Sequence, residues 1–309
     1  MNNLTNIDKD LLAQIADMHQ IPQGSYNIRK NGQTLSRSSD ADIQIVPKKD
    51  KNGIDIIVRA GVKNKSVHIP VIITETGIND LVYNDFYIGK DSEITIVAGC
   101  GIHNTGKQKS EHNGIHSFHL DKNSKVKYVE KHLGLGTKSD KVLNPVTDII
   151  MEDNSSFEME TIQLGGVSYS KRDTTALLKN NAKLVIKERI LTTEKQTAIT
   201  NFQVELKGKH SSVDVISRSV AKDSSYQEFN SNIVGKNECF GHVECDGIIT
   251  GKAKISSTPR VFAEDVNASL VHEAAIGKIA GDQVTKLLTL GLSQEQAENI
   301  IIKGFLNGK

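Results

Sequence analysis

The sequence predicts a mainly β protein built as a right-handed parallel β-helix, with a short helix before this core and a helical segment after it. From about residue 35 to residue 265, short runs alternate polar and apolar residues, which is the pattern of half-buried strands. The runs recur about every thirty residues without a helical pattern between them, as expected for stacked repeats. Only 37% of the 309 residues are hydrophobic, 5% are aromatic and none is Trp, which suits the thin layers of a solenoid.

The first expected element is an amphipathic helix at 6–19, with Asn6 as its N-cap. Its apolar residues fall on one face at spacings of four, four and three: Ile7, Leu11, Ile15 and Met18. Pro22 and Gly24 end the helix, so residues 1–24 form an N-terminal helical segment.

Residues 25–265 form the expected β-helix core. Ser92, Ser124, Ser156, Ala182 and Ser212 mark its phase, with spacings of 32, 32, 26 and 30 residues. Two or three strands fit into each period, which favours a parallel β-helix. An antiparallel sandwich has the same alternation, because periodicity does not fix strand direction. The expected strands are 42–46, 53–58, 92–97, 116–120, 124–129, 146–151, 156–161, 182–187, 200–206 and 212–217.

The C-terminal segment, 266–309, changes to a helical pattern. One helix is expected at 281–290, stopped by Gly291. A second begins after Ser293, which caps it, with Gln296 as the reciprocal partner in a capping box. These helices either cap the end of the solenoid or dock into a groove of a partner protein.

The bulk properties exclude several classes of partner. Lys plus Arg number 38 and Asp plus Glu 37, so a polyanion such as nucleic acid is not expected as a ligand. No signal peptide and no run of about 18 apolar residues is present, so we expect no membrane association. Three cysteines, Cys100, Cys239 and Cys245, do not form a disulfide framework, which favours a cytoplasmic location with free thiols.

Two clusters have the residue types of a metal site. Cys239, His242 and Cys245 lie close together, but their spacing matches no standard zinc motif, and free cysteines are commonly buried in cores. Five of the ten histidines fall between His103 and His132, and most of them are interpreted as surface residues. His116 begins an apolar run and is the best oriented, while His119 has the opposite strand parity.

The sequence has no nucleotide-binding motif. Gly134–Ser139 resembles a phosphate loop, but Thr137 stands where the glycine before the lysine is required. No nucleophile elbow and no H-E-x-x-H motif occurs. We therefore expect a non-catalytic chain that binds no nucleotide, with any ATP hydrolysed by a partner.

A series of motifs near the C-terminus resembles the SufB/SufD family of the SUF iron–sulfur cluster assembly system. Their order and spacing match over about sixty residues, and the β-rich region before them is consistent with that family's right-handed parallel β-helix. The matching motifs are Glu244–Gly251, Pro259, His272–Lys278, Asp282-Gln283, Gly291–Ser293, Ala297 and Gly304-Phe305.

The resemblance implies a scaffold on which a transient iron–sulfur cluster is assembled at a dimer interface. It implies that the β-helix forms the dimer and that the C-terminal helices bind an ABC-type ATPase, SufC. The cluster-linked residues of the family carry over to Cys245, His272 and Glu273. A Gly-Cys and a Leu-His pair in SufB resemble Gly99-Cys100 and Ile115-His116, which adds Cys100 and His116 as further candidate ligands.

Thiolate is the preferred ligand of iron–sulfur clusters, and imidazole or carboxylate ligands suit a cluster that must be released. The His-Glu pair is SufB-like, whereas the Ile-Gly-Lys after it is closer to SufD, and the tryptophan-bearing segment of SufB is absent. We infer a homodimer, with a heterodimer with a sister chain left open. The alternatives are a SufD-like structural subunit that binds no cluster and, less favoured, a β-helix enzyme acting on carbohydrate.

Overall fold

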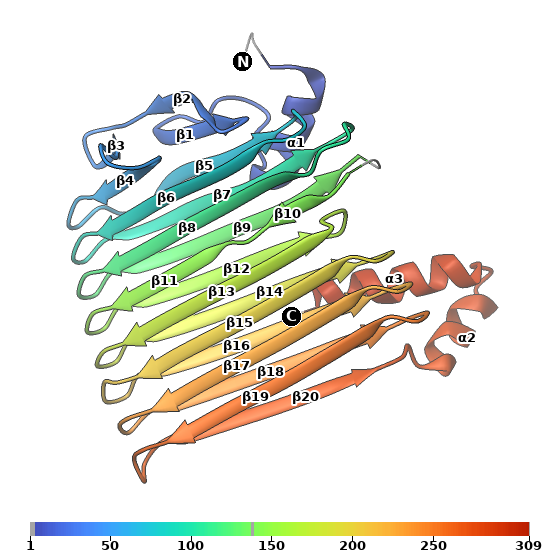
Figure 1. Cartoon of the computed structure of the whole chain (residues 1–309). Coiled ribbons are helices and arrows are strands. Elements are labelled where there is room, and N and C mark those ends of the chain that lie inside the picture. The colour runs from blue at the N-terminus through green and yellow to red at the C-terminus, as the bar shows by residue number, and fades with distance from the viewer. Residues whose placement is uncertain (1–3, 137–138, 309) are drawn as a thin grey trace.

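The computed structural model describes residues 4–136 and 139–308 and shows a parallel β-solenoid of about eight turns (Figure 1). Consecutive strands alternate between two ten-stranded sheets, so each turn contains two strands. Pairing along the solenoid is parallel, which confirms the predicted β-helix architecture and excludes the antiparallel sandwich. Thr137, which interrupts the phosphate-loop pattern, lies outside the described residues.

Sheet A carries the candidate residues Cys245, His272 and Glu273. Its strands, in spatial order, are β2 (Gln33–Ser38), β1 (Ser25–Lys30), β5 (Lys65–Ile73), β7 (Glu93–His103), β9 (Lys125–Leu135), β12 (Ser156–Leu164), β14 (Lys183–Thr192), β16 (Ser212–Ala221), β18 (Phe240–Ile249) and β20 (Ser269–Gly277).

Sheet B faces sheet A across the core. Its strands, in spatial order, are β19 (Lys254–Ala263), β17 (Tyr226–Gly235), β15 (Thr197–Leu206), β13 (Tyr169–Leu178), β10 (Lys141–Leu143), β8 (Ser110–Leu120), β6 (Asn79–Ile88), β4 (Gly53–Val58) and β3 (Ile43–Pro47). β11 (Val146–Met151) continues the position of β10 between β8 and β13.

The two ends of the solenoid differ. At the N-terminal end, the antiparallel pairs β1–β2 and β3–β4 close the sheets. At the other end, β19 and β20 are the edge strands of the two sheets. β20 extends the solenoid past residue 266, where the C-terminal segment was expected to begin. His272 and Glu273 are therefore strand residues, because Leu270 to Ile276 continue the alternation of the core.

A recurrent turn sets the length of each coil. A residue in the left-handed conformation, such as Asn123 or Asn154, precedes a buried Ser or Ala. The hydroxyl groups of these serines donate to the carbonyl oxygen three residues earlier, at 2.6 to 2.7 Å. Asn and Asp tolerate the left-handed conformation, which explains their frequency at this turn. The turn serines are Ser92, Ser124, Ser155 and Ser211.

The apolar core lies between the two sheets. Phe86 and Phe118 stack at a centroid distance of 4.2 Å, and Phe157 meets Phe118 edge to face at 5.0 Å. Away from this aromatic group, the core consists mainly of Ile, Val and Leu, as expected from the composition. Each layer therefore buries few side chains, and stability depends on the stacking of neighbouring turns.

Three helices accompany the solenoid: α1 (Asn6–Ala16), α2 (Gly281–Thr289) and α3 (Gln294–Asn307). α1 packs on β5, β7 and β9, and α3 packs on β16, so both lie on sheet A. Thr5 rather than Asn6 caps α1, because its hydroxyl accepts from the Asp8 amide in a capping box. The helix ends at Ala16, earlier than expected, since Asp17 adopts a left-handed conformation.

The predicted capping box of the last helix is confirmed. The Ser293 hydroxyl accepts from the Gln296 amide, and the Gln296 side chain accepts from the Ser293 amide. In the described parts of the chain, no helix has the length and apolar character required to cross a bilayer.

Candidate functional site

Strand alternation separates the predicted ligands at the C-terminal end of sheet A. Cys245 on β18 points into the solenoid, and its register neighbours are Ser217 on β16 and Ala274 on β20. His272 pairs in register with Val243, so it also points inward. By strand geometry, the Cα atoms of Cys245 and His272 are roughly 8 Å apart. Glu273 is the next residue and therefore points to the outer face.

Cys245 is a buried thiol. Its side chain is 1% exposed, and β18 continues in register with β16 without a bulge at Gly241. Burial raises the pKa of Cys245 to about 11, while the Ser257 hydroxyl acts in the opposite direction. The group is therefore a protonated thiol at neutral pH. Binding of a metal cation would release this proton, since the thiolate is the ligand.

His272 offers a free ring nitrogen. Its Nε2 is buried and has no hydrogen-bond partner among the described residues. Burial lowers the pKa of His272, and the nearby His242 lowers it further. The ring is therefore neutral at neutral pH, which is the form that binds metal ions. An unsatisfied buried nitrogen requires an explanation, and a ligand supplied from outside the chain is one.

Glu273 belongs to a cluster of charged residues on the outer face. Its register neighbour is Glu244, which lies on the same strand as His242 and Asp246. Burial raises the pKa of Glu244, and the neighbouring Asp246 raises it further. His242 contacts Asp214 at 2.8 Å through Nδ1. In the described part of the chain, no three His, Cys, Asp or Glu side chains converge as a metal site would require.

The end of the solenoid next to this site is open. Inward-facing residues of the last turn are exposed to solvent: Val261 on β19 is 44% exposed and Ile276 on β20 is 39% exposed. Equivalent positions in earlier turns are covered by the next coil. His272 therefore lies on the edge strand of this uncapped end, and Cys245 lies on the strand next to it.

A second group of predicted residues lies in the N-terminal half of the interior. Cys100 on β7 and His116 on β8 come from opposite sheets and border one cavity of about 10 Å3, which is the size of a single water. Both ring nitrogens of His116 are occupied, by Tyr128 at 2.8 Å and by Asn84 at 3.3 Å. Burial lowers the pKa of His116 to about 4. These two residues are thus packed together in a space too small for a cluster.

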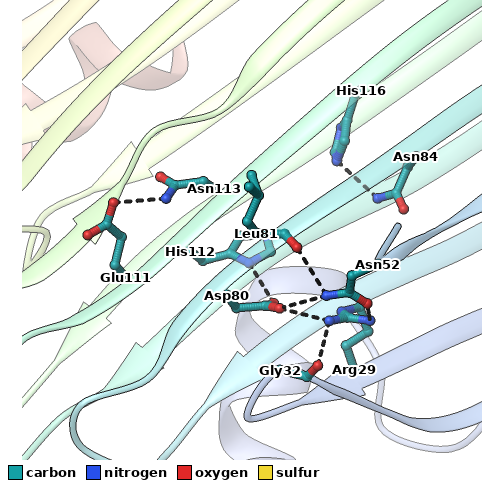
Figure 2. A network of polar contacts seen from close by, with 10 residues as sticks. All are labelled: Arg29, Gly32, Asn52, Asp80, Leu81, Asn84, Glu111, His112, Asn113 and His116. Atoms are coloured by element: carbon teal, nitrogen blue, oxygen red, sulfur yellow. Dashed lines mark hydrogen bonds and ion pairs between the residues drawn. The ribbon is translucent and has the colours of Figure 1, made fainter. Parts of the chain in front are cut away.

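The histidines of this region are more buried than the surface interpretation predicted. His112, His116 and His132 are each between 5% and 7% exposed. Figure 2 shows His112 beside Asp80, which also forms an ion pair with Arg29 at 2.8 Å. The surface interpretation was wrong for His112 and His132, because their strand parity directs them inward. His116, which was expected to be the best oriented, also points into the solenoid.

A row of buried polar residues links the two halves, and sequence reasoning missed it. On sheet A the register connects Glu130, Thr161, Glu188, Ser217 and Cys245. The Ser217 hydroxyl donates to Glu188 at 2.9 Å, and Arg172 pairs with Glu130 at 2.7 Å. Burial alone would raise the pKa of Glu130, but Arg172 and His132 hold it well below its usual range. The sequence signal that could have revealed this row is a charged residue at a strand position whose parity directs it inward.

Comparisons with known proteins identify the family to which the sequence is similar. Residues 82–305 match the family described as "SUF system FeS cluster assembly, SufBD core domain". The chain is similar to an iron–sulfur cluster assembly SufBD family protein of Methanocaldococcus jannaschii, with 27% identity over 289 residues, 92% of this chain and 90% of that protein. A SufBD family protein of Archaeoglobus fulgidus is 28% identical over 283 residues, 90% of this chain and 73% of the relative.

A third relative is longer than this chain. It is a SufBD family protein of Methanothermobacter thermautotrophicus, 28% identical over 242 residues. The aligned region covers 77% of this chain but only 58% of that protein. The family match at residues 82–305 includes most of the solenoid and the C-terminal helices, and this longer relative contains additional sequence.

Proposed function

Because this chain belongs to the SufBD family of the SUF iron–sulfur cluster assembly system, we propose that it is a scaffold subunit on which a nascent cluster is assembled between two chains. The cluster is cargo rather than a resident cofactor. Cys245 on β18 and His272 on β20 provide the inward ligands. Glu273, the residue after His272 on β20, provides a carboxylate on the outer face. The chain itself is non-catalytic, and we place it in the cytoplasm, where its three thiols stay reduced.

One observation supports this proposal above the others. A buried thiol and an unpartnered imidazole lie next to the uncapped end of the solenoid. A second copy stacked on this end would cover Val261 and Ile276 and would double the number of ligands by two-fold symmetry. The free edges of β19 and β20 would also gain partners, which removes the aggregation hazard of open edges. A sister chain of the same fold would cover this end and pair with the free edges in the same way.

The C-terminal helices are proposed to bind an ABC-type ATPase. α2 has no buried side chain; Leu288 in its last turn is 42% exposed, and Leu290, its C-cap, is 77% exposed. α3 is anchored on the solenoid, where Ile302 and Leu306 pack against Val220. β20 leads into α2 within a few residues, so movement of α2 by the ATPase would be transmitted to the strand that carries His272.

A SufD-like structural role without a cluster is the second candidate. The complete burial of Cys245, with a pKa of about 11, favours it, since an inert thiol is a common core residue. Anaerobic reconstitution with iron and sulfide separates the two functions. We expect a visible-absorbing cluster in the dimer that is lost in Cys245→Ala and His272→Ala and weakened in Glu273→Ala.

Cys239→Ala and Glu205→Ala are the matched controls, because they remove a second buried thiol and a half-exposed carboxylate on sheet B that pairs with Lys236. Equal iron content in all five variants and the native protein would leave only the structural role. For the ATPase, Leu288→Asp with Leu290→Asp should abolish co-purification, whereas the neighbouring Thr289→Asp should not. Retention of the complex by the double variant would contradict the docking proposal.

A further inference from the structure

The outer face of sheet B has a continuous row of apolar side chains. The register connects one residue from each of five adjacent strands, and three of these residues are 42% exposed: Ile57, Tyr87 and Ile150. The Tyr87 and His119 rings stack at 5.1 Å. We call this set the outer apolar row; its members are Ile57, Tyr87, His119, Ile150 and Leu177. α1 and α3 pack on sheet A, so they do not cover it.

All members of the row except Leu177 line a shallow groove of about 440 Å3. Exposed apolar patches of this kind mark interaction sites in soluble proteins. Four steps between neighbouring strands, at about 4.8 Å each, give the row a length of about 19 Å. An α-helix of about thirteen residues has the same length, and its apolar stripe repeats every 5.4 Å. A helix laid across the strands therefore matches the row.

Carboxylates border the row on both sides. Two residues before the row, β4, β6 and β11 carry Asp55, Asp85 and Asp148. Two residues after the row, just past the ends of β8 and β11, lie Asp121 and Glu152, while Arg59 and Lys179 take the same position after β4 and β13. Lys48 contacts Asp55 and Asp85, and Lys179 pairs with Glu152. Asp121 and Asp148 have no cationic partner among the described residues. The border is therefore net negative beside the middle of the row.

Lysines of the chain itself already contact one end of this face. At its β4–β6 end, Lys48 reaches the aspartate border and Lys51 lies over the Tyr83 ring at 4.3 Å. Towards β8 and β11 the acidic border continues, and Lys179 neutralises Glu152 there, but Asp121 and Asp148 have no cationic partner among the described residues. A positively charged segment from another protein would supply the missing cations there.

We propose that the outer apolar row and its acidic border form a docking site for a basic amphipathic helix of a partner protein. The site lies on the sheet opposite to α1 and α3 and away from the open end of the solenoid. It is therefore separate from the proposed dimer and ATPase contacts, and its occupation is compatible with both.

The probe is a fluorescent 14-residue helical peptide with leucines at i, i+4, i+7 and i+11 and lysines flanking them. Binding to the full chain is followed by fluorescence anisotropy. We expect saturable binding that weakens with salt and is at least about tenfold weaker for the double variant Tyr87→Ser, Ile150→Ser. Asp121→Asn with Asp148→Asn should weaken it severalfold. Leu164→Ser, a 51% exposed residue on the outer face of sheet A, should have no effect.

Two control peptides complete the test. One has the same composition with the leucines shuffled, and the other has glutamate in place of lysine; neither should bind. Equal binding of the shuffled peptide, equal affinity of all variants, or no saturation at millimolar concentration would overturn the proposal. Light scattering of the same variants tests whether a second copy of the chain occupies the row. If the native protein is a dimer that dissociates in the variant Tyr87→Ser, Ile150→Ser, the proposal of a partner helix is also overturned. Asp148 is half-buried and the other substituted residues are exposed, and circular dichroism is used to check that each variant is folded.

Discussion

Burial of His116 should make folding depend on pH between about 6.5 and 4. The His116 ring lies inside the solenoid between Tyr128 and Asn84, and burial lowers its pKa from 6.5 to about 4. Between these values the unfolded chain binds a proton that the folded chain excludes, so stability falls as the pH falls. At about 1.4 kcal/mol for each tenfold change in proton affinity, the loss is about 3 kcal/mol between pH 7 and pH 4.

The perturbation is His116→Gln, which keeps a polar side chain but removes the titrating group. We expect the variant to lose about 1 kcal/mol at pH 7, because the contact with Tyr128 is impaired, and to lose less stability than the native protein on acidification. His119→Gln is the control, since His119 lies on the same strand with the opposite parity. The assay is urea unfolding at several pH values, followed by circular dichroism because the chain has no Trp. Parallel stability curves for native protein and His116→Gln from pH 7 to 4.5 would refute the reasoning.

Three further changes test the interior and the turns. Arg172→Met should lower the free energy of unfolding by about 3–5 kcal/mol, because it leaves the Glu130 carboxylate buried without its cation. The double variant Arg172→Met, Glu130→Gln should recover much of this loss. If urea unfolding shows no recovery, the two residues are not paired. Gly134→Ala should destabilise the chain or prevent expression, because its Cβ would lie 2.0 Å from the carbonyl oxygen of Gly166, and a native melting temperature would exclude this close approach. Thr5→Ala should lower the free energy of unfolding by about 1 kcal/mol, because the N-cap of α1 is lost. An unchanged melting temperature would contradict this prediction.

Much of the fold follows from local patterns. The strands at 53–58 and 146–151 begin and end as predicted, because alternation and turn residues are local signals. The cap at Ser293 was also predictable, since a capping box involves only four residues. The phase markers taken from the sequence lie within one residue of the turn serines Ser92, Ser124, Ser155 and Ser211, because the turn requires a small residue; Ser225, which makes the same hydrogen bond, was not marked.

The candidate site was only partly predictable. Cys245, His272 and Glu273 were found as a set by resemblance, but adjacent residues of a strand point to opposite faces. The location of His272 and Glu273 on β20 therefore separates them, which was not recognised while residues 266–309 were expected to be helical. The Glu130–Arg172 pair was missed because its partners lie on different strands and different sheets.

The sequence alone determined that this chain is a stack of β-strand turns with a capped helix at its C-terminus, since hydrophobic period and caps act over a few residues. Tertiary structure decided which polar residues are buried, which of them meet across the two sheets, and which end of the solenoid stays open. These depend on the register between strands about thirty residues apart. Register is fixed by the packing of the whole core, so no single segment encodes it.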